Sequence, residues 1–166
     1  SSRIRVTGGS APLRVPAGTG LIPVTLRDVH MTADVEASPE LASGGGVALT
    51  NGRLGGFVTL ESIFDGLNEI ARSCDCLQKD VFASSDDQWS CTATDDDKSA
   101  CSGEDVLPFC REFLSQPAIC GVAAQQIVTN ADFDGLPADA PDGDIDSYSF
   151  GATFSAKSAE ITGTAQ

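Results

Sequence analysis

Histidine, tryptophan and tyrosine are almost absent from this sequence, with one residue of each. A single histidine, His30, offers little material for a histidine-containing zinc site or for a base paired with a nucleophile. The sequence also lacks a P-loop, a dinucleotide-binding glycine fingerprint and a nucleophile elbow. Carboxylate pairs for glycoside hydrolysis stay open among the 24 acidic residues, but one Trp and one Tyr make a poor sugar-stacking surface. We therefore expect a protein that is not an enzyme.

Basic residues are scarce, with 10 Lys and Arg against 24 Asp and Glu, and the net charge is −14. The first 56 residues hold five bases and four acids, whereas the rest of the chain holds five bases and 20 acids. An acidic body disfavours nucleic acid and anionic membranes as partners and favours cations or basic surfaces. Solubility in a salty or extracellular medium is the simpler interpretation of this charge.

Long apolar runs are missing as well, because no stretch approaches the ~20 apolar residues that span a bilayer. We therefore expect no membrane span. The sequence begins at Ser1 without an initiator Met. We interpret this beginning as a mature form whose export signal has been removed, or as a chain that carries no such signal.

Cysteine is absent outside the segment from Cys74 to Cys120. No Cys-x-x-Cys pair is present, which argues against zinc, thioredoxin-like redox chemistry and covalent haem attachment. The even number of cysteines instead predicts up to three disulfides and an oxidising compartment, with reduced buried thiols as the alternative. We expect an extracellular, cell-surface or periplasmic location. The predicted disulfide residues are Cys74, Cys76, Cys91, Cys101, Cys110 and Cys120.

Strand patterns lie at both ends of the chain. Residues 21–35 alternate apolar and polar side chains but change phase near Val29, which predicts a β-bulge. Residues 147–157 alternate apolar with small polar side chains, as in an antiparallel sheet with one wet face. Asn51-Gly52 between two β-like runs predicts a hairpin, with a single strand kinked at its glycines as the alternative. We expect an α+β fold in which both ends of the chain pair in one antiparallel sheet or sandwich.

The middle of the chain, residues 59–129, is predicted to be a helical insert. Thr59 suits the N-cap of a first helix, and Ser102 opens a second. A third helix starts at Pro117 and ends near Asn130. Residues 75–103 are expected to be irregular, with the Asp95-Asp96-Asp97 run on solvated loop surface. Because the cysteines lie in or beside this insert, we expect disulfides to hold the insert while the sheet depends on packing alone.

Residues 1–20 are expected to form an extended basic arm ahead of a single α+β domain, residues 21–166. The alternation from Arg3 to Val6 suits a short strand, and glycines and prolines interrupt the rest of the arm. Such an arm could add a strand to a neighbouring sheet while its arginines meet carboxylates there. The predicted assembly residues are Arg3, Ile4, Arg5, Val6 and Arg14.

Acidic residues cluster just after the C-terminal end of the insert. An Asn-x-Asp-x-Asp-Gly run starts at Asn130 and matches the opening of a calcium loop, in which alternate oxygen ligands converge around a glycine turn. A related Asp-Gly-Asp-x-Asp run starts at Asp142, but Pro141 stands where a complete loop has its last glutamate. A flexible acidic loop is the alternative. The candidate calcium ligands are Asn130, Asp132, Asp134, Asp139, Asp142, Asp144 and Asp146.

A resemblance rests on this acidic segment and the strand after it, Asp146-Ser-Tyr-Ser-Phe-Gly-Ala-Thr-Phe-Ser-Ala. Together with an Asn-Gly-Arg-Leu-Gly-Gly run from Asn51, an amphipathic helix and downstream cysteines, it resembles uncharacterised secreted and lipoprotein-like cell-surface proteins of myxobacterial type. The resemblance covers residues 21–74 and 130–162. Those proteins carry a tighter Asp-Gly-Asp-Gly loop than this chain. The resemblance implies an exported, cell-surface-associated protein with a calcium site, and no particular activity.

Two non-enzymatic functions fit these observations. The first is a structural subunit, stabilised by calcium, that self-assembles at the cell surface or in an extracellular filament through the N-terminal arm. Its partners would be copies of itself or another cell-surface protein. The second is a monomeric periplasmic or cell-surface binding module that depends on calcium. An arm that pairs with the sheet of its own chain would favour the module.

Overall fold

The computed structural model describes residues 2–17, 20–38, 46–85, 88–132 and 146–159. The chain divides into two compact units, and each is described by itself. We call the first the sheet unit; it consists of Ser1–Ala11, Leu26–Phe57 and Ser149–Gln166. We call the second the disulfide unit; it consists of Pro12–Thr25 and Val58–Tyr148.

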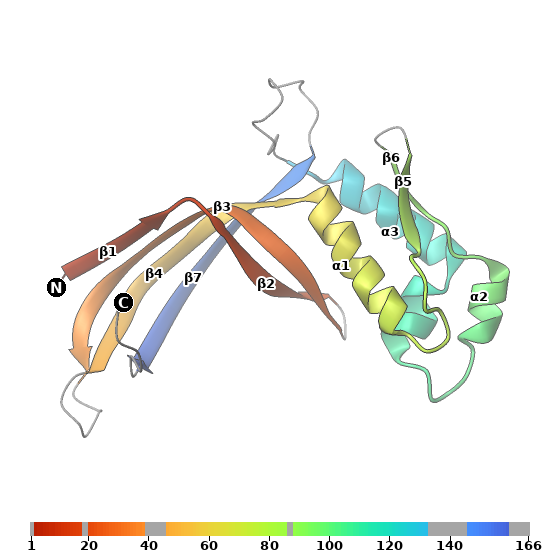
Figure 1. Cartoon of the computed structure of the whole chain (residues 1–166), viewed down its shortest axis with the longest axis horizontal. Helices are drawn as coiled ribbons and strands as arrows, with labels where there is room; N and C mark the ends of the chain where they lie inside the picture. The colour runs from red at the N-terminus through yellow and green to blue at the C-terminus, as the bar shows by residue number, and fades with distance from the viewer. Residues whose placement is uncertain (1, 18–19, 39–45, 86–87, 133–145, 160–166) are drawn as a thin grey trace, which may run out of the picture. The chain divides into compact units, whose positions relative to one another are not determined.

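Five strands form one antiparallel sheet (Figure 1). Its strand order is β1-β3-β4-β7, and β2 also pairs with β3. The strands are β1 (Ser2–Thr7), β2 (Ser10–Ala17), β3 (Gly20–Ser38), β4 (Gly46–Thr59) and β7 (Ser147–Ala159). The N-terminal and C-terminal strands thus lie in one sheet, and a helical segment separates them in sequence, which confirms the predicted α+β fold.

Two irregularities in the pairing of β3 with β4 correspond to residues with left-handed backbone. The register shifts between Arg27 and His30 of β3, where Asp28 has φ +48°. A second shift opposite Thr32 and Asp34 coincides with Asn51 of β4, at φ +51°. Asp and Asn tolerate this conformation better than most residues, so each accommodates a bulge. The first bulge confirms the one predicted from the change of apolar phase in β3.

The hairpin predicted at Asn51-Gly52 is wrong, because β4 runs through both residues as one strand. The alternative, a single strand irregular at its glycines, describes β4 correctly. A Cβ on Gly52 would lie 2.6 Å from the carbonyl oxygen of Phe154 and 2.7 Å from its ring. Glycine is therefore needed here for the close approach of β7, not for a turn.

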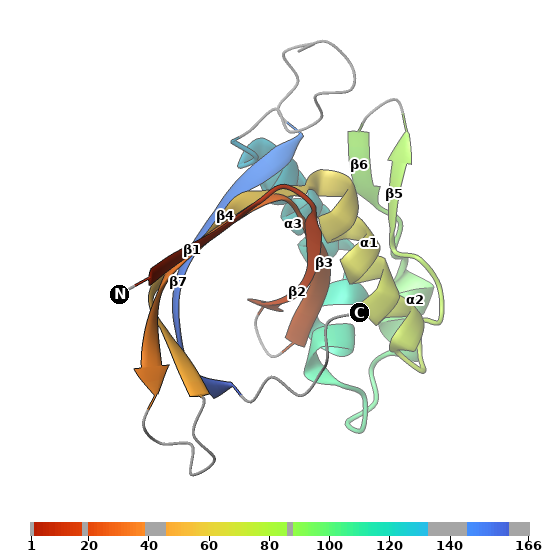
Figure 2. The same ribbon diagram turned by 60° about the vertical axis from the view of Figure 1, so that its left-hand side comes forward.

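The disulfide unit contains the helices and a small hairpin (Figure 2). Its elements are α1 (Leu60–Ser73), β5 (Phe82–Ser85), β6 (Gln88–Cys91), α2 (Asp95–Ala100), the π-helical turn η1 (Cys110–Leu114) and α3 (Pro117–Thr129). The Thr59 hydroxyl caps α1 by accepting a hydrogen bond from the Ser62 amide at 3.2 Å. The first and third predicted helices are confirmed, and α3 ends with Asn130 as its C-cap.

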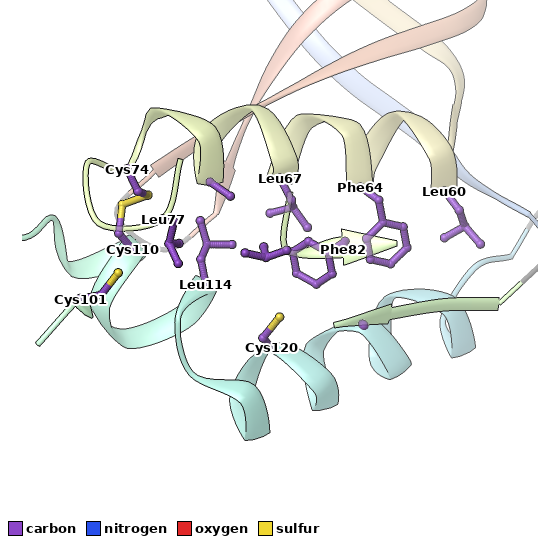
Figure 3. Close-up of a cluster of buried hydrophobic side chains, with 13 residues drawn as sticks. Leu60, Phe64, Leu67, Cys74, Leu77, Phe82, Cys101, Cys110, Leu114 and Cys120 are labelled. Atoms are coloured by element: carbon purple, nitrogen blue, oxygen red, sulfur yellow. A yellow bond between two sulfur atoms is a disulfide. The ribbon is translucent and has the colours of Figure 1, made fainter. Parts of the chain in front are cut away.

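Aromatic side chains close the core between α1 and the β5–β6 hairpin (Figure 3). The fully buried Phe64 ring stacks on Trp89 with ring centroids 4.4 Å apart and lies 5.2 Å from Phe82. The buried Asn68 side chain accepts hydrogen bonds from the Val81 and Phe82 amides and donates to the Phe82 carbonyl. Asn68 therefore attaches the hairpin to α1 without leaving a buried polar group unsatisfied.

Three disulfides join Cys74 to Cys110, Cys76 to Cys101, and Cys91 to Cys120. Their Cα–Cα distances are 6.0, 5.2 and 5.6 Å, within the range of unstrained disulfides. Each closes a long loop and stabilises the fold by roughly 2–4 kcal/mol. All three lie in the disulfide unit, as the sequence predicted, and they indicate an oxidising, extracytoplasmic compartment.

The insert differs from the prediction in three places. The acidic run Asp95-Asp96-Asp97 is not loop surface but begins α2, because Thr94 and Asp97 form a reciprocal capping box. The helix expected from Ser102 is reduced to the short turn η1, since Pro108 cannot donate the amide that a continuous helix requires. The stretch expected to be irregular also contains the β5–β6 hairpin, whose four-residue strands are too short to show a period.

Candidate functional site

An apolar pocket of about 550 Å³ lies in the disulfide unit. The volume falls within the range of small-molecule sites, roughly 300–1,000 Å³. Strand β3, helices α1 and α3, and the turn η1 with the residues before it all contribute side chains. The lining residues are Ile22, Ile63, Leu67, Pro108, Phe109, Glu112, Phe113, Ala123, Gln126 and Ile127.

One wall of the pocket is formed where β3 crosses α1 at Gly66. A Cβ on this glycine would lie 2.0 Å from the Pro23 carbonyl oxygen and 2.9 Å from the Ile22 side chain, so only glycine fits. The Thr25 amide donates to the Ser62 hydroxyl at 2.8 Å, which fixes the strand on the helix. These contacts bring Ile22 to the pocket beside the apolar face of α1.

A second wall is formed by the π-helical turn η1. The Ser115 amide donates to the Cys110 carbonyl at 3.0 Å, which is the i→i+5 bond of a π-turn. The Phe109 and Phe113 rings stack at 4.9 Å and both face the pocket. Such turns recur at functional sites, because the extra residue re-aims neighbouring side chains. Here the turn supplies two aromatic faces to one cavity.

Disulfides hold three of the elements that line the pocket. Cys74–Cys110 ties the C-terminal end of α1 to η1, and Cys91–Cys120 ties α3 to β6, which lies outside the lining. The core behind the pocket contains Leu67 and Leu114, at 1% and 0% exposure. A ligand therefore meets a pocket whose walls are already fixed, and little ordering cost accompanies binding.

Exposed apolar side chains continue the apolar lining onto the surface. Ile119 and Val122 of α3 are 50% and 55% exposed, and they share a helix face with Ala123 and Gln126 of the lining. Leu107, next to the lining residue Pro108, is 65% exposed. Large exposed apolar side chains gathered in one place mark binding surfaces more often than isolated ones do.

Polar groups at the pocket are few among its described lining residues. Glu112 forms an ion pair with Arg111, with the Arg111 Nη2 atom 2.8 Å from the carboxylate, and its side chain is 66% exposed. Gln126 supplies an amide. With an acidic group at the rim and an acidic unit around it, the pocket suits a neutral or cationic apolar group and disfavours a fatty-acid carboxylate.

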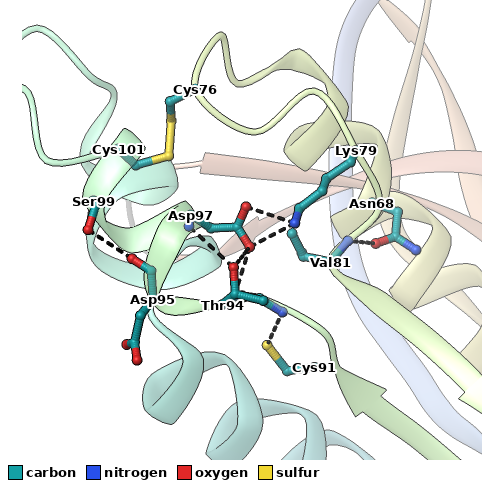
Figure 4. Close-up of polar contacts among 11 residues, drawn as sticks. Asn68, Cys76, Lys79, Val81, Cys91, Thr94, Asp95, Asp97, Ser99 and Cys101 are labelled. Carbon is teal, nitrogen blue, oxygen red and sulfur yellow. Dashed lines mark hydrogen bonds and ion pairs between the residues drawn. A yellow bond between two sulfur atoms is a disulfide. The ribbon is translucent and has the colours of Figure 1, made fainter.

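A polar network around the buried Asp97 carboxylate supports the disulfide unit away from the pocket (Figure 4). The Lys79 ammonium lies 2.7 and 2.8 Å from the two carboxylate oxygens of Asp97, and Thr94 donates its amide and hydroxyl at 2.7 and 2.9 Å. Burial acts to raise the pKa of Asp97, but the hydrogen bonds from Lys79 and Thr94 outweigh it and hold this pKa below its usual value. The carboxylate is engaged in holding α2, so the network is structural.

The candidate calcium ligands fall partly within the described structure. Asn130 uses its amide to donate to the Gln126 carbonyl at 2.8 Å, and Asp146 accepts from the Ser147 hydroxyl at 2.7 Å. The Asp132 amide donates to the Ser147 carbonyl at 3.0 Å, so the two ends of the acidic segment are joined. The other candidates, Asp134, Asp139, Asp142 and Asp144, lie outside the described residues.

Within the described ranges, no three acidic, histidine or cysteine side chains gather in a way that could hold a metal ion. Tyr148, just beyond the acidic segment, donates its hydroxyl to the Ile127 carbonyl. Burial, followed by the negative charge of Asp132, raises the pKa of this tyrosine, so it stays protonated and keeps the donor. Calcium binding remains a prediction from the sequence pattern.

The predicted assembly residues lie on strands of their own chain's sheet. β1 pairs antiparallel with β3 from Ser2 opposite Val35 to Thr7 opposite His30, and Arg14 lies on β2. The Arg3 Nε atom is 3.9 Å from the Asp34 carboxylate. This arrangement is the one expected of a monomeric module. Assembly through exchanged arms stays a prediction.

The sequence pattern does not predict the pocket. Its lining comes from four segments separated by up to about a hundred residues, and the apolar periodicity of α1 and α3 gives only a core-facing interpretation. The one available signal is the group of aromatic residues after a proline, Pro108, Phe109 and Phe113, which helical spacing alone assigns to the apolar side of a helix.

No helix in the described part of the chain is both long enough and apolar enough to cross a bilayer. The chain matches no protein-family model, no curated protein and no solved structure. The fold and the pocket geometry are therefore the basis for considering function.

Proposed function

We propose that the protein is an exported, non-enzymatic binding module whose disulfide unit receives an apolar group in the pocket between α1, η1 and α3. The observation that carries this proposal is the pocket itself, which measures about 550 Å³, has an aromatic and aliphatic lining, and has its α1 and η1 walls joined by the Cys74–Cys110 disulfide. The pairing of β1 with β3 of the same chain also favours the module over the assembling subunit. The proposed location is periplasmic, extracellular or at the cell surface.

The test uses N-phenyl-1-naphthylamine, a neutral apolar dye whose fluorescence increases on leaving water. We expect saturable binding to the full chain, and at least a tenfold loss in an Ala123→Trp variant, whose indole fills the pocket. Ala118→Trp is the matched control, because Ala118 is exposed on the same helix and outside the lining. Equal dye binding by the two variants, or no saturable binding by the parent, would contradict the proposal.

The calcium requirement is proposed from the spacing of the seven candidate ligands. Calorimetry of the full chain with calcium should give a binding heat that disappears in a combined Asp132→Asn, Asp134→Asn and Asp144→Asn variant. Absence of heat in the parent would remove calcium from the proposal without affecting the apolar pocket.

Self-assembly through the N-terminal arm is the second candidate function. The observation that favours it is the edge position of β1, because the six pairs that β1 makes with β3 could equally be made with a neighbour's β3. Light scattering on the full chain and on a variant lacking residues 1–16, each with calcium and with chelator, tests this. Monomers in all four samples would exclude it.

A further inference from the structure

The sheet unit has one face built almost entirely of apolar side chains. Residues paired across an antiparallel ladder share a face. The register places Ile4 opposite Ala33, Val6 opposite Met31, Met31 opposite Leu54, and Val35 opposite Leu49. Gly52 lies two residues before Leu54 on β4, so both residues share this face. The Phe154 ring lies against the position that a Cβ on Gly52 would occupy, and Phe154 therefore belongs to the same face. We call this the apolar face.

The opposite face of the same strands is polar. Arg5 and Arg53 flank Thr32, while Asp34 pairs with Arg3 and accepts from the Asn51 amide at 3.0 Å. This contrast shows that the alternation in each strand separates two environments rather than arising by chance.

The apolar face is only partly covered. Ala33 is fully buried, whereas Val6 is 47% exposed, and the other large side chains of the face are partly exposed: Ile4, Met31, Leu49, Leu54 and Phe154. The residues of the sheet unit that the structure describes include no helix, so no helix of the described part of the unit covers this face. A face of this size and composition is favoured when another apolar surface covers it.

The charge distribution selects the kind of partner. The sheet unit holds five bases and five acids and is neutral, whereas the disulfide unit holds five bases and 19 acids, a net charge of −14. Repulsion between two copies therefore comes from their acidic disulfide units and not from their neutral sheet units. Because the apolar face adds no charge repulsion of its own, it is the part of this acidic chain on which a second copy is least opposed.

The available area reaches what a specific contact needs. Four strands about 4.8 Å apart and about eight residues of ~3.3 Å each give roughly 500 Å² of sheet face, or about 1,000 Å² over two copies. Specific interfaces begin near this value, about 1,000 Å², and the weak ones lie at this end of the range. We infer that two copies pack their apolar faces together as a two-layer sheet sandwich, with a dissociation constant in the micromolar range.

Sedimentation of the full chain across a concentration series tests this inference. We expect a reversible dimer in the parent. Met31→Glu should weaken its affinity at least tenfold, because it places a carboxylate in the centre of the apolar face. Thr32→Glu is the matched control on the next residue, because its carboxylate would lie between Arg5 and Arg53 on the polar face. A parent that stays monomeric, or equal dimerisation by both variants, would overturn the inference.

Salt dependence provides a second test that needs no variant. Screening reduces repulsion between the acidic units, so a dimer formed through the apolar faces should tighten as salt is raised from 20 to 500 mM, which shortens the ionic screening length about fivefold. A dimer formed by basic arms on acidic surfaces should weaken instead, and that result would overturn the face-to-face arrangement. Binding of a monomeric parent to phosphatidylcholine vesicles would likewise overturn it and assign the face to lipid.

Discussion

The disulfide unit contains all three disulfides, the stacked aromatic core and nearly all of the fully buried apolar side chains that the structure describes, whereas the sheet unit contributes only Leu26 and Ala33 to that set. The disulfide unit is strongly acidic and the sheet unit is neutral. Crosslinks and a closed core allow the first unit to tolerate its own charge repulsion. The sheet depends on backbone pairing and on whatever covers its apolar face.

Reduction of the disulfides should produce the largest difference between the units. Because three loops lose their closure at once, the disulfide unit should unfold at ambient temperature. Near-ultraviolet circular dichroism of Trp89 reports this loss, and backbone amide exchange of β3 and β4 reports the sheet. Retention of the Trp89 signal after complete reduction would mean that packing alone holds the disulfide unit, and the two units would then not differ in what stabilises them.

Truncation of one phenylalanine in each unit should show that a side chain in the closed core contributes more unfolding free energy than one on the partly covered sheet face. Phe64→Ala removes a fully buried ring stacked on Trp89 and should cost about 3–5 kcal/mol of unfolding free energy. Phe154→Ala removes a half-buried ring and should cost about 1–2 kcal/mol. Chemical denaturation at a concentration where the chain is monomeric gives both values. Similar costs would show that the apolar face is covered within the monomer.

Acid should weaken the capping network of α2 in a defined direction. The folded-state pKa of Asp97 is lowered, so its contribution to stability is present above the unfolded value and is lost as the pH falls through the folded value. Asp97→Asn should destabilise the chain by about 1 kcal/mol at neutral pH through loss of the capping and Lys79 contacts. The difference in melting temperature between parent and variant should shrink below about pH 4. A difference that stays constant to about pH 2, well below the usual range of aspartate, would contradict this assignment.

The sequence predicted what depends on local pattern. Alternation in 147–157, the phase change near Val29, the Thr59 cap and the confinement of the cysteines each indicated a feature that the structure contains. The failures had two causes. Gly52 lies within a strand that β7 approaches closely at Phe154, a contact that the local pattern does not reveal. Asp97 begins a helix through a local capping box with Thr94, which the interpretation of the aspartate run as loop surface overlooked, and through the distant Lys79.

Dependence on long-range contacts also explains why the sequence does not predict the pocket. The pocket exists because Gly66 admits β3 against α1 and because Cys110 and Cys120 are bonded to elements earlier in the chain. Cysteine pairing and strand–helix crossing are long-range choices, so a sequence contains the residue types of such a pocket without revealing its assembly. The acidic segment is the opposite case, since its calcium pattern is local and its prediction needs no tertiary contact.

Removal of the Arg3 side chain should have the smallest effect and identifies what holds the arm. The Arg3–Asp34 contact is long, at 3.9 Å, and the Arg3 side chain is 64% exposed. Exposed pairs of this kind contribute about 0–1 kcal/mol, whereas the β1–β3 ladder supplies backbone hydrogen bonds along six residues. Arg3→Ala should therefore change the unfolding free energy by less than about 0.5 kcal/mol and leave its salt dependence unaltered.

Ile4→Pro is the variant that contrasts with Arg3→Ala. It removes a backbone donor from β1 and restricts the backbone geometry of the strand, so it should expose the β1 amides to hydrogen exchange. If Arg3→Ala released β1 as completely as Ile4→Pro, then charge rather than backbone pairing would hold the arm. That result would favour an arm that binds acidic surfaces over an arm held by the backbone pairing seen between β1 and β3.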